Sequence, residues 1–330
     1  MLKGNPETGL YNRDLPKGCE FCRLGGKLVV FVTGECGDDC YYCPVSFERF
    51  GRPVSYANER RATDLEDYLQ EAYRMGALGA GITGGDPILA IDRTVELIER
   101  FKAYFGPEFH VHLYTTGRYV NLDALRELKR AGLDEIRFHP IKEVYWKAVE
   151  KAVKVGLTVG LEVPAVEDFN FDGLVKRAKE LGVKFININE LEVTPRNAVF
   201  MRARGHLADH GLAGSSKSHE LALSLLRAYE SYDLSLHYCT SLYKDVVETR
   251  NRFIRTFRIS SFPFEDLNPE GTVVRAIVRT NADLSDYGPK LEEGTYVVSP
   301  SLLEEIKTKY GVQEVKIIEE LPSGLKVTES

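Results

Sequence analysis

Three cysteines in one short segment are the residues of this chain best suited to metal chemistry. Residues 34–44 read GECGDDCYYCP, so Cys36, Cys40 and Cys43 are separated by three and by two residues. Three thiolates at this spacing can bind three irons of a cubane [4Fe-4S] cluster and leave the fourth iron without a protein ligand. An open metal position is what substrate activation requires. The segment therefore predicts a catalytic iron–sulfur cluster.

The remaining cysteines indicate a second candidate metal site. Five of the six cysteines lie between positions 19 and 43, and the sixth follows a histidine near position 238. In a reducing compartment such clustering favours metal ligation over disulfides. The candidate ligands of a second zinc or iron–sulfur site are Cys19, Cys22, His237 and Cys239. The alternative is that these residues are ordinary buried thiols and a core histidine.

A zinc ribbon is the competing interpretation of the same cysteines. The pairs Cys19/Cys22 and Cys40/Cys43 are separated by 17 residues, which is a spacing typical of zinc ribbons. The protein would then be a zinc-stabilised binding module. This alternative leaves Cys36 without a role and does not explain the repeated strands and helices that follow.

From residue 27 to residue 194, short apolar runs alternate with longer amphipathic stretches, and the apolar runs recur every ~25 residues. This alternation predicts a parallel sheet with right-handed crossovers. The predicted strands are 27–33, 79–83, 110–115, 135–139, 158–163 and 184–193, and the predicted helices are 65–75, 92–105, 122–131, 145–155 and 171–181. Six units fall short of the eight of a closed barrel. The predicted fold class is therefore α/β, a partial (β/α)6 open barrel, with a doubly wound open sheet as the alternative.

Three parts are expected along the chain. Residues 1–26 form an N-terminal segment with the first cysteine pair, and residues 27–248 contain the partial barrel, a long loop at 196–218 and a helix at 220–229. Residues 249–330 predict a small α+β domain. Its predicted strands are 253–259, 272–278, 295–298, 314–319 and 325–328, with a helix at 301–310.

The cysteine segment follows the first predicted strand, at the end where α/β enzymes build active sites. With Tyr42 before its last cysteine, it resembles the cluster-binding motif of the radical S-adenosylmethionine superfamily. The resemblance implies that the methionyl group of S-adenosylmethionine chelates the fourth iron. One electron then cleaves the sulfonium, and a 5′-deoxyadenosyl radical abstracts hydrogen from a substrate.

Two further turns extend the resemblance. Residues 83–87 (TGGDP) are similar to the Gly-Gly-Glu-Pro turn of the family, with Asp in place of the commoner Glu, and residues 115–117 are loosely similar to its turn near the ribose. The implied cofactor-binding residues are Tyr42, Gly84, Gly85, Asp86, Thr115, Thr116, Gly117, Glu162 and Asn189. Within the superfamily the chain resembles archaeal-type proteins related to pyruvate formate-lyase activating enzymes. This implies an external electron donor, ferredoxin or flavodoxin, but no particular substrate.

Polar residues on the predicted strands are candidates for the substrate cavity. Side chains alternate along a strand, so Arg137 and His139 share one face of the fourth strand, and Asn187 occupies the matching face of the sixth. Polar groups inside a barrel need partners or a ligand. Glu190 has the opposite parity to Asn187 and joins the set only if the strand bulges. The alternative is that these groups are solvated at the barrel mouth.

Two arginine-bearing stretches could bind a phosphorylated or nucleic-acid substrate. The first contains Arg196, Arg202 and Arg204, and the second contains Arg250, Arg252, Arg255 and Arg258 with Phe253 and Phe257. Solvated charge and ion pairing are the simpler explanation. The substrate, small molecule or macromolecule, is left open.

Composition limits the class of protein. A net charge of −6, from 43 basic and 49 acidic residues, argues against general nucleic-acid binding. No apolar run reaches the ~18 residues of a membrane span, and residues 1–17 lack an apolar signal core, so we expect a cytoplasmic protein without membrane contact. Abundant charge with few glutamines favours a thermophile.

Overall fold

The computed structural model describes residues 1–329, which divide into two compact units. The first unit comprises residues 1–72 and 77–248. The second comprises residues 73–76 and the described residues from Thr249 onward.

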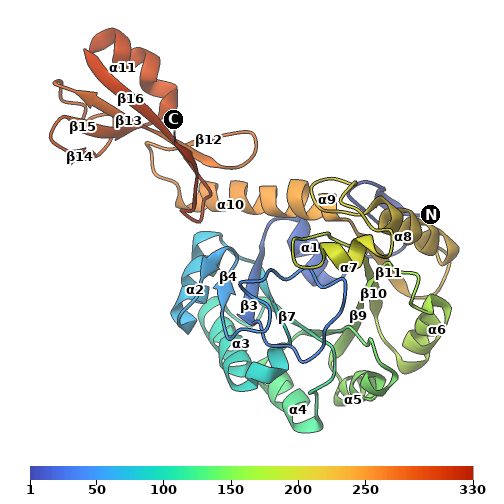
Figure 1. The fold of residues 1–330 in the computed structure, drawn as a ribbon. Helices are drawn as coiled ribbons and strands as arrows, with labels where there is room; N and C mark the ends of the chain where they lie inside the picture. Colours follow the sequence, from blue (N-terminus) through green and yellow to red (C-terminus); the bar gives the residue numbers. More distant parts are fainter. Residues whose placement is uncertain (330) are drawn as a thin grey trace. The chain divides into compact units, whose positions relative to one another are not determined.

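The first unit is built on a sheet whose central strands are all parallel (Figure 1). Their order across the sheet is β11-β10-β9-β8-β7-β6-β3. The strands are β3 (Lys27–Thr33), β6 (Gly79–Gly84), β7 (His110–Thr115), β8 (Glu135–Phe138), β9 (Thr158–Pro164), β10 (Phe185–Asn189) and β11 (Ser235–Cys239). All six predicted strands are confirmed, and β11 is a seventh that the sequence analysis did not identify.

The sheet does not close on itself, which confirms the open-barrel prediction. Antiparallel strands continue it at both ends: β4 (Tyr56–Ala57) and β5 (Arg60–Arg61) beyond β3, and β2 (Gly9–Tyr11) and β1 (Lys3–Asn5) beyond β11. The N-terminal residues therefore extend the barrel wall next to its last parallel strand.

Amphipathic helices cover the outer face of this sheet (Figure 1). They are α2 (Leu65–Arg74), α3 (Ile91–Phe105), α4 (Leu122–Ala131), α5 (Trp146–Val155), α6 (Phe171–Leu181) and α8 (Ser216–Ala228). Shorter turns are η1 (Pro87–Ala90), η2 (Glu143–Tyr145), α7 (Ala198–Arg202), α9 (Ser241–Tyr243) and the π-helical η3 (Lys244–Thr249). Ile136 and Phe138, buried under these helices, alternate with Arg137, which faces the barrel interior.

Helix α1 (Lys17–Arg23) lies on the opposite, inner side of the sheet. It packs against β3, β6 and β7, and the Cys19 sulfur lies 3.5 Å from Nη1 of Arg137. A Cβ on Gly18 would come within 2.8 Å of Nη2 of Arg137, so only glycine lets the helix approach this closely. The helix therefore fills one end of the barrel interior.

The second unit is a small antiparallel sheet with helices, as predicted. Its strands run in the order β14-β15-β13-β16-β17, with β12 paired to β13. The elements are α10 (Arg250–Ser260), β12 (Asp266–Leu267), β13 (Val273–Thr280), β14 (Lys290–Glu292), β15 (Thr295–Val298), η4 (Pro300–Leu302), α11 (Leu303–Lys309), β16 (Val312–Glu320) and β17 (Lys326–Glu329). Its core contains Ala276, Val278, Leu284, Tyr296, Val298 and Ile306.

The predicted strand at residues 253–259 is wrong, because this segment belongs to helix α10. β-Branched and aromatic residues suggested a strand. Its buried residues, Arg252, Phe253 and Thr256, follow the three-to-four-residue spacing of a helix face instead. None of the described helices is long and apolar enough to cross a membrane.

Candidate functional site

The predicted cluster ligands lie in the irregular loop that connects β3 to β4. Cys36, Cys40 and Cys43 are all free and half-buried. Burial raises the pKa of Cys36, and it raises the pKa of Cys40 to about 11, to which the neighbouring thiols Cys43 and Cys36 add. A nearby cation stabilises the thiolate form of cysteine, so this set of three thiols in one loop fits an iron cluster.

Asp38 anchors the first half of the cysteine loop. Its buried carboxylate accepts hydrogen bonds from the Tyr145 hydroxyl at 3.0 Å and the Lys142 ammonium at 2.8 Å, and it pairs with Arg118 at 3.1 Å. Burial opposes ionisation, but the bonds from Lys142 and Tyr145 outweigh it and lower the pKa of Asp38. Cys36 and Cys40 are thereby tied to the turns after β7 and β8.

The segment after β10 anchors the second half of the loop. Arg196 donates to the carbonyl oxygens of Val45 at 2.9 Å and Cys43 at 3.2 Å. Asn197 donates to the carbonyl oxygen of Tyr42 at 3.2 Å. Arg196, one of the arginines considered for phosphate binding, is therefore engaged in holding the cysteine loop.

The glycine turn lies directly against the backbone that leads to Cys36. The N–H of Gly85 donates to the Thr33 carbonyl at 2.7 Å, and the N–H of Asp86 donates to the Glu35 carbonyl at 2.7 Å. A Cβ on Gly84 or Gly85 would overlap with these same carbonyl oxygens. The two glycines are needed because no side chain fits between the two segments.

Asp86 joins the glycine turn to the turn after β7. Its fully buried carboxylate accepts from the hydroxyls of Thr115 and Thr116, both at 2.9 Å, and from the N–H groups of Thr116 at 3.2 Å and Ile88 at 3.1 Å. Burial raises the pKa of Asp86 despite these bonds. The three motifs predicted from sequence are thus adjacent in the fold: the Asp86 carboxylate bonds to the turn after β7, and the Asp86 N–H bonds to the cysteine segment.

A hydrogen-bonded chain runs from the cysteine loop into the barrel. The Tyr42 hydroxyl lies 2.8 Å from Nε2 of His139, whose Nδ1 lies 2.8 Å from the Glu162 carbonyl oxygen. Because a carbonyl only accepts, Nδ1 carries the proton and Nε2 accepts from Tyr42. His139 is therefore held at both ring nitrogens, and burial lowers its pKa.

Glu162 is the hub of the polar interior. Its carboxylate accepts from Nη1 of Arg137 at 2.8 Å, from Nδ2 of Asn187 at 2.6 Å and from Nδ2 of Asn189 at 2.7 Å. The sequence analysis assigned these four residues to the cofactor and to the substrate separately. In the fold they form one network.

This network lines a cavity of about 400 Å³ inside the barrel. All four predicted substrate-cavity residues line it: Arg137, His139, Asn187 and Glu190. Further lining residues that the sequence analysis missed include Lys27, Glu192, Tyr243, Lys244 and Glu248. A charged residue opening an otherwise apolar strand was the available signal for Lys27; the others depend on the fold.

Comparison with known proteins decides the family. The family model described as "Radical SAM superfamily" matches residues 30–142. A Methanocaldococcus jannaschii protein named "Putative glycyl-radical enzyme activating enzyme MJ0021" is 39% identical over 295 residues, which cover 84% of this chain and 78% of that protein. This chain belongs to the radical SAM superfamily.

More distant similarities are narrower. The "Probable GTP 3',8-cyclase" of Aeropyrum pernix is 28% identical over 191 residues, which are 51% of each chain. Among solved structures, Streptococcus suis SuiB bound to S-adenosylmethionine has a TM-score of 0.46 at 13% identity, covering 66% of this chain and 51% of that one. The chain is a radical SAM enzyme, and the family uses a [4Fe-4S] cluster and S-adenosylmethionine.

The zinc-ribbon alternative is wrong for this radical SAM enzyme. Cys19 and Cys22 lie in α1, whereas Cys40 and Cys43 lie in the loop after β3. Among residues 1–329, no three of these cysteines bring their sulfurs within 4.8 Å of one another. The four sulfurs therefore do not gather around a single ion.

The residues of the second candidate metal site line the same cavity, but their ligand atoms do not converge on a common position. Cys19, Cys22, His237 and Cys239 all line the interior cavity. In the described part of the chain, no three of them place ligand atoms within 4.8 Å of one another. The Cys19 sulfur is instead 3.4 Å from Nδ2 of Asn187, and Nδ1 of His237 is 3.2 Å from Oδ1 of the same residue.

Proposed function

We propose that this enzyme holds a [4Fe-4S] cluster at Cys36, Cys40 and Cys43 and abstracts hydrogen from a substrate bound in the barrel cavity. The observation that carries the proposal is the chain from Tyr42 through His139 to Glu162, because it connects the cysteine loop to the cavity lining. A cofactor at the loop and a substrate in the cavity would then share one wall.

When bound and reduced, the cluster supplies the electron that cleaves S-adenosylmethionine into methionine and a 5′-deoxyadenosyl radical, which takes a hydrogen atom from the substrate. The electron comes from an external donor such as ferredoxin or flavodoxin. The protein's contribution is to position the reactants and to exclude water. Gly84, Gly85 and Asp86 would contact the methionyl end through backbone groups, and Glu162 and Asn189, which line the cavity, would bind the ribose.

The cavity chemistry favours a small polar substrate. Its cationic and anionic side chains are paired: Lys27 with Glu248 at 2.9 Å, Lys244 with Glu192, and Arg137 with Glu162. A lining of balanced charge suits a molecule with several hydrogen-bonding groups better than a polyphosphate or a nucleic acid. Among the arginines considered for those substrates, Arg196 is engaged at the cysteine loop and adds no support for them.

A glycyl residue of a partner protein is the second candidate substrate. This alternative rests on the name of the 39% identical relative, "Putative glycyl-radical enzyme activating enzyme MJ0021". Radical transfer to a protein would leave a stable radical on that partner, whereas turnover of a small molecule would consume it. Spectroscopy of the enzyme mixed with candidate partners therefore separates the two substrates.

The decisive experiment is anaerobic reconstitution followed by measurement of 5′-deoxyadenosine under dithionite. We expect the wild-type protein to be brown and to form 5′-deoxyadenosine, and Cys40→Ala to lose both properties. Glu48→Ala is the matched control, because this side chain of the same loop is exposed. Formation of 5′-deoxyadenosine by Cys40→Ala would refute the proposal.

The second metal site at Cys19, Cys22, His237 and Cys239 remains a proposal of its own. Metal analysis of a variant with Cys36, Cys40 and Cys43 all replaced by alanine tests it. Thiolate-bound zinc or iron in that variant would support the site, and absence of thiolate-bound metal would refute it.

A further inference from the structure

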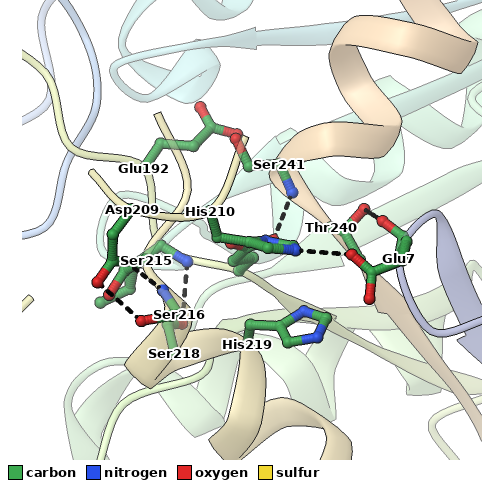
Figure 2. Close-up of polar contacts among 12 residues, drawn as sticks. Glu7, Glu192, Asp209, His210, Ser215, Ser216, Ser218, His219, Thr240 and Ser241 are labelled. Atoms are coloured by element: carbon green, nitrogen blue, oxygen red, sulfur yellow. Dashed lines mark hydrogen bonds and ion pairs between the residues drawn. The ribbon is translucent and has the colours of Figure 1, made fainter. Parts of the chain in front are cut away.

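Three potential metal ligands from distant parts of the sequence meet outside the cluster loop. Glu7 lies in the turn between β1 and β2, His210 lies in the loop before α8, and His219 lies in the first turns of α8. One ligand atom from each residue lies within 4.8 Å of the other two. Figure 2 shows the two imidazole rings beside each other, with Glu7 reaching them from the N-terminal segment.

A hydrogen bond at Nδ1 fixes the orientation of each imidazole ring. Nδ1 of His210 lies 2.7 Å from Oε1 of Glu190, and Nδ1 of His219 lies 2.8 Å from the Tyr238 hydroxyl. Each bond fixes the ring at Nδ1 and leaves Nε2 for the metal, which would replace the 3.1 Å contact between Nε2 of His210 and Oε2 of Glu7. A buried carboxylate behind a histidine is the usual arrangement around zinc-binding histidines.

The supporting carboxylate is itself fixed. Glu190 is fully buried and accepts from the N–H of Ser241 at 2.8 Å. A Cβ on Gly214 would overlap with its Oε1, so the chain keeps this position clear of side chains. On the other side, the Glu7 carbonyl accepts from the Thr240 hydroxyl at 2.7 Å, which places the Glu7 turn.

We propose that Glu7, His210 and His219 bind a Zn²⁺ ion, with water in the fourth position. Two imidazoles and one carboxylate are a common three-residue ligand set for zinc, and they leave one position open. Glu7 is 58% exposed, so its side chain can close on the ion, and solvent provides a path of entry. The ion would tie the N-terminal turn to α8 and to the loop after β10.

The charges around the rings fit a dication. Two carboxylates, those of Glu7 and Glu190, face the His210 ring. Burial alone would lower the pKa of His210, but the bonds to Glu7 and Glu190 raise it above its ordinary value. Because a histidine binds metal only in its unprotonated form, zinc affinity should fall as pH falls.

The experiment measures Zn²⁺ affinity of the full chain by competition with a chromophoric chelator, and Co²⁺ absorption to identify the ligands. The background is the variant lacking Cys36, Cys40 and Cys43, so that no cluster forms. We expect a site whose Co²⁺ spectrum lacks thiolate charge transfer. His210→Ala should weaken Zn²⁺ binding at this site by about 100-fold, and Glu190→Gln by about 10-fold or more.

Two controls separate ligation from folding. His206→Ala removes a buried histidine of the same loop, whose Nδ1 bonds to Ser215, and should leave affinity within about twofold. Glu7→Gln changes an exposed ligand without disturbing the core and should weaken binding by about 10-fold, whereas the exposed Asp14→Asn should not. Equal affinity of the parent and Glu7→Gln, or no site with nitrogen and oxygen ligands, would overturn the proposal. Neither readout depends on cleavage of S-adenosylmethionine.

Discussion

Replacing Asp86 by alanine is the sharpest test of how the cofactor turns are held. The Asp86 carboxylate is the common acceptor for the glycine turn and for the Thr115–Gly117 turn. In Asp86→Ala the Thr115 and Thr116 hydroxyls can rotate toward other acceptors. The N–H groups of Ile88 and Thr116 cannot, because the backbone fixes their direction.

The magnitude follows from those two N–H groups. A buried donor left without an acceptor costs about 1–3 kcal/mol, so two cost about 4 kcal/mol. For a domain of this size each kcal/mol lowers the melting temperature by about 2–4 °C. We therefore expect Asp86→Ala to melt about 8–16 °C below the wild type. Asp86→Asn keeps one acceptor oxygen and should lose less.

Thermal unfolding by circular dichroism and 5′-deoxyadenosine formation are measured on the same anaerobic preparations. We expect both to fall, since a misplacement of about 1 Å can cost about 100-fold in rate. Asp92→Ala, an exposed acid on α3, is the control and should change neither. If Asp86→Ala lost activity but melted within about 2 °C of the wild type, Asp86 would act on the cofactor directly and the reasoning would be refuted.

Three other outcomes test separate parts of the structure. Tyr42→Phe removes the hydroxyl bonded to His139 and should lower stability by about 1 kcal/mol with unchanged iron content, measured by melting and iron analysis. Gly85→Ala places a Cβ against the Glu35 carbonyl and should weaken S-adenosylmethionine binding by more than about 10-fold, measured by equilibrium binding. Burial lowers the pKa of His110 to about 4, below its unfolded value, so the unfolded chain binds the proton more tightly. His110 should therefore contribute about 3 kcal/mol to the fall in unfolding free energy as pH drops from about 6.5 to about 4, and His110→Gln should remove this contribution.

The buried parallel strands were predictable because their apolar runs are continuous and helices separate them. Strand β11 was not predicted because its five residues (SLHYC) do not form a continuous apolar run. Leu236 and Tyr238 are buried on one face, and His237 points to the barrel interior. Such a short alternating run does not stand out from a loop. At α10 a strand was predicted where the chain forms a helix, because β-branched residues on that helix favoured a strand.

The cluster motif could be predicted from spacing alone, because all three cysteines lie in one loop. The role of Asp86 could not, since its partners Thr115 and Thr116 are supplied by a different strand. The same holds for Glu7, which comes near His210 and His219 because β2 pairs with β11. Sequence spacing identifies local ligand sets, whereas sites assembled across strands require the topology.

Burying polar and charged side chains inside the barrel costs free energy, which points to a functional reason for them. Arg137 is 2% exposed and pairs with Glu135 at 2.5 Å and Glu162 at 2.8 Å. Buried ion pairs of this kind are often no more stabilising than apolar packing would be. In addition, Nη2 of Arg137 has no hydrogen-bond partner among the described residues. A core selected for stability alone would replace these groups with apolar side chains. Their presence around a cavity, with α1 bringing Cys19 against Arg137, is consistent with an interior shaped for a polar ligand.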